Sequence, residues 1–271
     1  GLIAQDLVST YGESLFRDIF VPDLSVQVAD NDEPGIIVAE DGGALRLFEG
    51  QPVTESSLAN LIVSSYTVVL TRSPEETIRV VAAPLSLSER EEAAGAMGIS
   101  LASGLESESS NYRSTGASLA FTQDNWFIPQ HVSVFAPNDE VAEGRRSYVI
   151  QHTVTQGARS GDGGAYDGLV VPGVAVEVYD DDAASVVVVP VAEDPANPLQ
   201  GRADGRTRVS ENPESFGDDV YALALTRQPV GPVTITIEDS AGQLEISLDG
   251  ANFASSQSLS LQNANTPSYI T

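Results

Sequence analysis

The stretch VPGVAVEVYDDD, residues 171–182, has an earlier copy in the same chain, VPDLSVQVADND, residues 21–32. Each copy begins with Val-Pro and then alternates apolar and polar residues over the length of a strand, which is the pattern of a half-buried β-strand. Each copy ends on three consecutive side chains that offer oxygen atoms. A stretch that recurs this far along a chain, in the same form, predicts a repeat.

The repeat extends beyond this strand. The segment IIVAED, residues 36–41, returns as VVPVAED, residues 188–194, and YTVVLTRSP, residues 66–74, returns as YALALTRQP, residues 221–229. Because the matching pieces come in the same order, we predict three units. Residues 1–32 are the final strands of one repeat, residues 33–182 are a complete repeat, and residues 183–271 are a following repeat that lacks its last strands.

Further alternating segments fill the middle repeat, and each is bounded by Pro, Gly, Asn or Asp, which is typical of strands between turns. They are residues 77–83, 118–122, 130–136 and 147–155. One segment departs from this pattern, SEREEAAGAM at residues 88–97, which has helix-forming residues after a serine that can cap a helix. The sequence therefore predicts an all-β fold with one short helix or loop insertion.

The composition limits the possible partners. The 271 residues carry 39 acidic and 13 basic side chains, all of the latter Arg, for a net charge of −26, yet 41% of the residues are hydrophobic. That share of apolar residues, in alternating runs, is enough for a buried core and argues against disorder. The acidic surface would repel nucleic acid and anionic membranes, so we expect no nucleic acid partner and no membrane insertion. Without Cys, neither disulfides nor thiolate metal sites can stabilise the chain.

No motif indicates an enzyme. The sequence has no phosphate-binding loop and no nucleophile elbow, and in so acidic a chain carboxylates will be adjacent by chance, so they do not indicate a glycosidase pair. His131 and His152 are the only histidines, and both lie in strand patterns, where we expect them to pack on strand faces. We expect the single Trp, Trp126, to be a buried sandwich residue, whereas an exposed aromatic pair with Phe127 would indicate sugar binding.

Five motifs occur in a characteristic order: Asp-Asn-Asp after an alternating strand, Val-x-Glu before a strand that ends in Leu-Thr-Arg, NWFIPQ at 125–130, DEVAEG at 139–144, and the closing Val-Pro strand. In this order the chain resembles Calx-beta and Calx-beta-like repeats, which occur in tandem in large bacterial surface proteins and adhesins. The resemblance covers residues 33–182 and parts of both flanks. It implies an elongated array of tandem immunoglobulin-like β-sandwiches at the cell surface or outside the cell, with Ca²⁺ bound by loops at one end of each sandwich.

The same resemblance implies a set of metal ligands. In the middle repeat they are Glu55, Asn111, Asp139, Glu140, Glu143, Asp180, Asp181 and Asp182, and in the flanking repeats Asp30, Asn31, Asp32 and Glu211. Asn111 stands where the family often has Asp. Physical chemistry supports the set, because Ca²⁺ takes about six to eight oxygen ligands from converging loops and an Asp triplet repels itself without a counter-ion. The alternative interpretation is that these residues are linker acids and turn formers.

The function predicted from these features is that of a calcium-stiffened stalk or spacer, related to adhesion, whose partners are the neighbouring repeats. Two alternatives remain open. One is a module that binds a glycan or a surface protein through the insertion at residues 84–110. The other is a filament subunit, a homopolymer in which residues 1–32 complete the open sandwich of the next molecule by strand addition; the simpler explanation of the same complementary ends is a segment cut from a longer array.

Overall fold

The computed structural model of this chain is almost entirely β, which confirms the predicted all-β class. It describes residues 2–3, 24–25, 30–40, 44–51, 58–106, 112, 116–157, 164–192, 202–210 and 218–271. Within these ranges there is one short helix, α1 (Glu89–Ala94), and none that has the length and apolar character of a membrane span.

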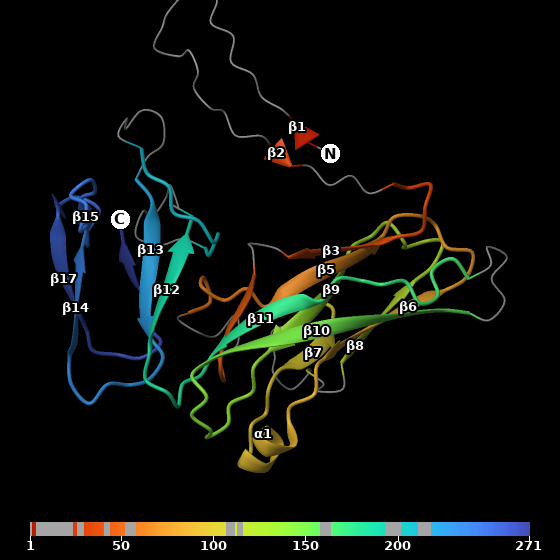
Figure 1. Ribbon diagram of the computed structural model, residues 1–271, viewed down its shortest axis with the longest axis horizontal. Coiled ribbons are helices and arrows are strands. Elements are labelled where there is room, and N and C mark those ends of the chain that lie inside the picture. The colour runs from red at the N-terminus through yellow and green to blue at the C-terminus, as the bar shows by residue number, and fades with distance from the viewer. Residues whose placement is uncertain are drawn as a thin grey trace, which may run out of the picture.

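Residues 33–182, called here the middle sandwich, form two sheets (Figure 1). The first has the order β3-β5-β9-β7, with strands Ile36–Glu40, Ser65–Leu70, Gln130–Phe135 and Ser100–Ser103. The second has the order β4-β11-β10-β6-β8, with strands Leu45–Phe48, Val174–Tyr179, Arg145–Gln156, Ile78–Pro84 and Ala117–Phe121. All neighbours are antiparallel except β4 and β11, which run parallel.

The core lies between the two sheets because alternate residues of each strand turn inward. In β5 the inward residues Tyr66, Val68 and Leu70 are at most 2% exposed, and in β6 Ile78 and Val80 are fully buried. These side chains belong to one continuous apolar cluster. Burying a side chain of this size stabilises the fold by about 1.5–3 kcal/mol, so the alternation read from the sequence accounts for the two-layer packing.

Two strands of the middle sandwich were not foreseen, β4 and β7. The chain leaves β3 in the first sheet and enters β4 in the second, so its first strand is divided between the layers. β4 then pairs with the closing strand β11, with Leu45 opposite Val176 and Phe48 opposite Tyr179. This pairing brings the residues that follow both strands to one end of the sandwich.

The helix forms where the sequence predicted it. Ser88 caps α1 by accepting a hydrogen bond from the amide of Glu91, and the Glu91 carboxylate accepts one from the amide of Ser88, a capping box. The helix ends at Gly95, whose φ of 96° is in the left-handed region. An ion pair between Glu91 and Arg146 joins α1 to β10.

Residues 183–271, called here the last segment, form smaller sheets beside the middle sandwich (Figure 1). One has the order β12-β13-β18, with strands Val186–Val191, Val220–Leu225 and Ser268–Ile270. The others pair β14 (Val233–Glu238) with β17 (Ser256–Leu261) and β15 (Ile246–Ser247) with β16 (Phe253–Ala254). The amide of Ala203 donates to the carbonyl of Asn60 at 3.0 Å, so the last segment contacts the middle sandwich directly.

At the other end of the chain, β1 (Leu2–Ile3) and β2 (Leu24–Ser25) form a two-stranded antiparallel sheet. Within the described ranges these two strands pair only with each other.

Candidate metal centre

Three loops converge at one end of the middle sandwich. Glu49 follows β4, Asp180 to Asp182 follow β11, and residues 136–144 connect β9 to β10. The parallel pairing of β4 and β11 brings the first two loops together, and the amide of Glu49 donates to the carbonyl of Tyr179 at 2.9 Å. The amide of Gly50 donates to the carbonyl of Ala136 at 2.9 Å, which attaches the third loop to the first.

Asp180 organises two of these loops through its buried carboxylate, which is only 2% exposed. Its Oδ2 atom accepts hydrogen bonds from the amides of Glu143 and Gly144, the latter at 2.6 Å. Its Oδ1 atom accepts from the amides of Asp182 at 2.6 Å and Ala183 at 3.3 Å. A buried carboxylate that receives several amide bonds is well satisfied, so Asp180 fixes the course of the chain through the loop it begins.

Glu49 is the other buried acid, 4% exposed, and its Oε1 atom accepts from the amide of Asp139 at 2.6 Å. The pKa of Glu49 is raised to about 7, mainly by burial and also by the negative charges of Asp139, Asp180 and Asp181, against the opposing effect of that hydrogen bond. Burial, followed by the charges of Asp182 and Asp180, also raises the pKa of Asp181. Ionisation of these carboxylates is therefore unfavourable when no cation is bound.

The ligand-like arrangement consists of Glu49, Asp181 and Asp182, which each place one carboxylate oxygen within 4.8 Å of the other two. The Oδ2 atom of Asp182 is buried and has no hydrogen-bond partner, which is unusual for a buried polar atom. Ca²⁺ prefers hard oxygen ligands supplied by several loops. A divalent cation at this position would offset the repulsion and would provide the missing partner for Asp182.

The structure places the predicted ligands of the middle sandwich as follows. Asp139, Glu140, Glu143 and Asp180 to Asp182 all lie in the converging loops. Asp139 stabilises its own loop, because its carboxylate accepts hydrogen bonds from the amides of Met97 at 2.8 Å and Val141 at 2.7 Å. The Glu143 carboxylate accepts from the Tyr148 hydroxyl at 3.3 Å, and Glu140 is exposed on the same loop. Glu55, Asn111 and Glu211 lie outside the described residues.

The predicted residues of the first copy, Asp30, Asn31 and Asp32, are all exposed. Their local structure matches that of the second copy. The amide of Asp32 donates to Asp30 Oδ1 at 2.9 Å and Arg72 donates to the Asp32 carbonyl at 3.1 Å, just as Asp182 and Arg227 do in the second copy. Within the ranges that the structure covers, only the second copy has carboxylates from another loop beside it.

Glu49 is the ligand candidate that the sequence reasoning missed. A usable signal existed, because Glu49-Gly50 in the middle sandwich corresponds to Asp204-Gly205 in the last segment. Both glycines have a positive φ, 66° and 73°, so each acid is followed by a turn that favours glycine. At Gly50 a β-carbon would also lie 2.8 Å from the Asn138 side-chain oxygen. A repeated acid-glycine pair with the glycine in the left-handed region was therefore a marker of this loop.

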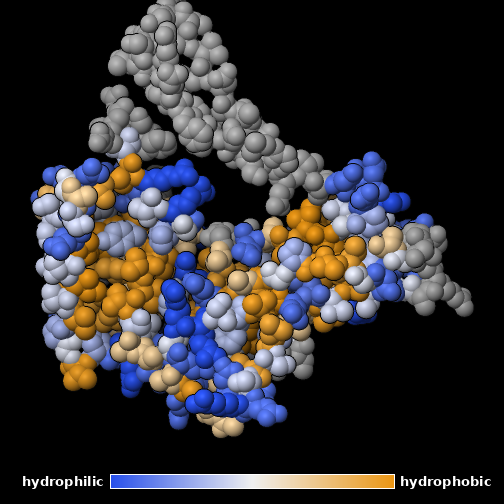
Figure 2. Space-filling model, in the orientation of Figure 1, coloured by the Kyte–Doolittle hydropathy of each residue, from blue (hydrophilic) through white to orange (hydrophobic). Residues whose placement is uncertain are grey.

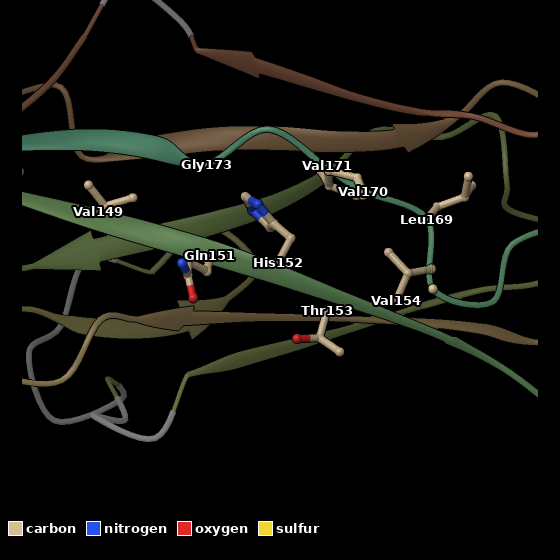
Figure 3. Close-up of a pocket in the computed structure, with 10 residues that line it drawn as sticks. Val149, Gln151, His152, Thr153, Val154, Leu169, Val170, Val171 and Gly173 are labelled. Atoms are coloured by element: carbon tan, nitrogen blue, oxygen red, sulfur yellow. The ribbon is translucent and has the colours of Figure 1, made fainter.

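Outside the acidic cluster, His152 lies at a shallow groove between β10 and residues 168–173, with its ring pointing toward that segment (Figure 3). Its Nε2 atom is 2.9 Å from the Tyr66 hydroxyl and its Nδ1 atom is 3.0 Å from the Pro172 carbonyl. Burial lowers the pKa of His152. The ring is thus held by two groups of the sandwich itself, as expected of a histidine packed on a strand face.

Trp126 is partly buried against the core, as expected of a sandwich residue. Its neighbour Phe127 is 58% exposed and Ile128 is 49% exposed. The rings of Trp126 and Phe127 are in edge-to-face contact, with centroids 5.7 Å apart. The exposed apolar surface of this loop therefore belongs to Phe127 and Ile128.

Comparison with known proteins does not assign a function to this chain, so a function must be inferred from the geometry of the site. No protein-family model matches this chain, and no curated protein sequence matches it. Among solved structures, one similar chain is described as the calcium binding domain CBD12 of CALX1.1. The match has 12% sequence identity, covers 86% of this chain and 73% of that chain, and has a TM-score of 0.27.

Proposed function

We propose that this chain is a calcium-binding structural segment, built from tandem immunoglobulin-like β-sandwiches, that serves as a stalk or spacer in an adhesion-type protein at the cell surface. The observation that carries the proposal is the convergence of Glu49, Asp181 and Asp182, with one oxygen from each within 4.8 Å of the others. This convergence occurs where the middle sandwich passes into the last segment.

The donor chemistry favours calcium over a transition metal. Every candidate ligand in this cluster is a carboxylate, and the chain has no Cys, whereas zinc and copper sites are built mainly from imidazole and thiolate. Ca²⁺ tolerates irregular loop geometry and completes its shell with water. A site with a dissociation constant of about 10⁻⁴ M would add about 2.7 kcal/mol of stability at a hundredfold excess of Ca²⁺.

The position of the cluster supports a mechanical role. Arg227 of the last segment donates to the carbonyl of Asp182 at 2.6 Å, so the Asp triplet contacts both the middle sandwich and the segment that follows. An ion that holds Asp181 and Asp182 to Glu49 would fix the direction in which the chain leaves β11. In a protein without disulfides, the ion would thus limit motion between neighbouring sandwiches.

Hydrogen bonds at the two junctions support the tandem arrangement. Thr226 donates to the carbonyl of Ala183 at 2.7 Å, and Thr71 donates to the carbonyl of Glu33 at 2.9 Å. Each threonine is followed by the arginine that binds the last Asp of the preceding triplet. The same set of contacts thus begins both the middle sandwich and the last segment.

Calorimetric titration with Ca²⁺ tests the binding. We expect saturable binding and a rise in melting temperature for the natural chain, and at least a tenfold loss of affinity in Asp182→Asn. The matched control is Asp124→Asn, which removes the same charge at an exposed turn away from the cluster. Absence of binding, or an equal loss in the control, would contradict the proposal.

Small-angle scattering tests the spacer role separately. We expect the particle to become more flexible when a chelator removes Ca²⁺, because the junction would lose its cross-link. If the scattering profile is the same with and without chelator while calorimetry still shows binding, the ion has no stiffening role.

A second candidate function is binding of a glycan or partner protein through the insertion at residues 84–110. The observation in its favour is exposed apolar surface, since Leu85, Met97 and Leu105 are 49%, 55% and 70% exposed and α1 buries none of its residues. A glycan array, compared between the natural chain and a Leu85→Ser, Met97→Ser double variant, separates this function from that of a pure spacer.

A further inference from the structure

The connection between β6 and β7 is longer than the sandwich needs. In the middle sandwich residues 85–99 join these strands, whereas in the last segment residues 239–245 join β14 to β15. β15 is the counterpart of β7, because Ser247 exchanges backbone hydrogen bonds with Thr271, directly after β18, just as β7 pairs with β9. β18 in turn lies beside β13 as β9 lies beside β5. The additional residues, which include α1, are therefore a feature of the middle sandwich, and such loops commonly carry function.

The two legs of this connection and strand β10 enclose a groove of about 190 Å³. Its apolar walls are formed by Leu85, Leu87, Met97 and Tyr148. Leu85 and Met97 are 49% and 55% exposed, whereas Tyr148 is 9% exposed, so the groove is open at the legs and closed at β10. Gly98 keeps space in the groove, because its φ is 65° and a β-carbon there would lie 3.3 Å from the Cδ2 atom of Leu87.

The groove is acidic at its rim, because Glu92 of α1 is the one charged side chain among the described residues that line it. Tyr148 brings a second acid close, since its hydroxyl donates to the Glu143 carboxylate at 3.3 Å. Arg146 is paired with Glu91, whereas Glu92 has no ion pair within the part of the chain that the structure describes. Figure 2 shows hydrophilic residues over the part of the visible face where α1 lies. The groove therefore combines apolar walls with an unpaired negative charge.

We propose that this groove binds the side chain of a lysine or an arginine that a partner protein presents. Its volume is below the about 300–1,000 Å³ of most small-molecule sites, so it holds one side chain and not a larger ligand. The aliphatic stem of a basic side chain suits the apolar walls, and its charged end suits the Glu92 carboxylate. A neutral side chain would leave Glu92 without a partner, and an acidic one would be repelled. The net charge of −26 also accelerates the approach of a basic protein.

A titration followed by nuclear magnetic resonance tests this proposal on the isotope-labelled 271-residue chain. The probes are peptides with blocked ends, Gly-Ser-Lys-Ser-Gly and its versions with norleucine or glutamate in place of lysine. We expect the lysine peptide to shift the amide signals of Leu85, Met97 and Gly98 in a saturable way. The norleucine peptide, which keeps most of the stem and lacks the charge, should bind about fivefold more weakly, and the glutamate peptide should not bind. All titrations are made in chelator, because binding of a basic side chain does not require the calcium site.

Glu92→Gln removes the charge and keeps the size of the side chain at the rim. It should weaken binding of the lysine peptide about fivefold and leave binding of the norleucine peptide unchanged. Glu89→Gln is the matched control, because it removes the same charge from an exposed position of the same helix that does not line the groove; it should bind like the natural chain. Both variants keep the cap of α1, which Ser88 and Glu91 form.

Three results would overturn the proposal. The first is the absence of saturable shifts with the lysine peptide at millimolar concentration. The second is equal weakening in Glu92→Gln and Glu89→Gln, which would show a general effect of charge. The third is a norleucine peptide that binds as tightly as the lysine peptide. Because recognition of a basic side chain rests on the second candidate function and specifies its partner, this third result would leave the insertion as an apolar docking surface and would remove only its preference for a base.

Discussion

The Tyr66 hydroxyl and the Nε2 atom of His152 lie 2.9 Å apart, and this hydrogen bond joins the two sheets of the middle sandwich through its core. Tyr66 is fully buried on β5, and His152 lies on β10 in a T-shaped contact with the tyrosine ring at a centroid distance of 5.5 Å. Burial lowers the pKa of His152 and raises the pKa of Tyr66 well above its ordinary value. The pair is therefore neutral at physiological pH.

The first prediction concerns the pH dependence of stability. A histidine whose pKa is lowered in the folded state binds fewer protons there than in the unfolded state. His152 should therefore make the free energy of unfolding decrease as pH falls below about 6.5. The decrease from this one group is at most about 1.4 kcal/mol per pH unit. Urea unfolding at pH 7.5 and pH 5.5 measures this, and His152→Gln should lose that part of the slope.

The control for this prediction is Tyr66→Phe, which removes the hydrogen bond and keeps the buried imidazole. It should lower stability by about 1 kcal/mol and retain the slope. An identical pH dependence in the natural chain and in His152→Gln would show that the histidine does not titrate between the two states.

The second prediction links calcium affinity to protons. In the cation-free protein the pKa of Glu49 is raised to about 7, and a carboxylate must be ionised to bind the ion. Its raised pKa also means that, without calcium, its contribution to stability is present at low pH and lost as pH rises from about 4.5 to about 7. We expect calcium affinity to increase about tenfold from pH 6 to pH 8, with proton release detectable by calorimetry in buffers of different ionisation enthalpy.

Glu49→Gln should bind calcium more weakly and should show little change in affinity over the same pH range. Glu140→Gln is the matched control, because Glu140 is exposed on the neighbouring loop and outside the three-oxygen cluster. Affinity that does not change with pH in the natural chain would contradict a role for Glu49 as a ligand.

The third prediction separates two adjacent acids. Asp180→Ala leaves four backbone amides without their acceptor, and we expect it to lower the free energy of unfolding by about 3 kcal/mol or more. Asp181→Ala removes a charge from a repelling cluster, so in chelator it should be neutral or slightly stabilising while it weakens calcium binding. Equal losses of stability in the two variants, measured by urea unfolding, would be incompatible with these roles.

The fourth prediction compares the two junctions. Arg227→Ala removes the side chain that contacts the carbonyl of Asp182, and Arg72→Ala removes the corresponding contact at Asp32. We expect Arg227→Ala to increase cleavage by a protease between residues 180 and 190, because the last segment would be held less firmly. Arg72→Ala is the matched control and should leave that cleavage unchanged; if it accelerates cleavage equally, the effect is not specific to the junction.

Alternation made most of the fold predictable. The strands around Tyr66, Ile78, Val132 and Val176 were foreseen within a few residues, because each turns one apolar face toward a core and is bounded by turn residues. The Asp triplet was predicted to form one wall of a cation site because it recurs after the same strand; the structure places Asp181 and Asp182 beside Glu49, and the binding of a cation stays a prediction.

The parts that were missed depend on contacts between distant residues. β4 is four residues long, and it is a strand because β11, far along the chain, pairs with it. Glu49 is a surface-type residue in a short turn, and its burial arises from the same pairing and from the loop that carries Asp139. No pattern in the sequence around Glu49 predicts a contact with residues so far along the chain. Asp139 was predicted as a ligand, whereas the structure shows its carboxylate accepting hydrogen bonds from the amides of Met97 and Val141, which stabilise its own loop; a role as a ligand stays a prediction.

The parallel pairing of β4 with β11 determines how the middle sandwich responds to tension. β4 enters near the start of the domain and β11 ends at its exit, with four residue pairs between them. A force that pulls these two ends apart slides the strands along each other, so the bonds between them are loaded together in shear and do not open one at a time. Resistance to forced unfolding is governed by the unfolding rate. In this geometry the hydrogen bonds between β4 and β11 carry the load and must break before the domain unfolds.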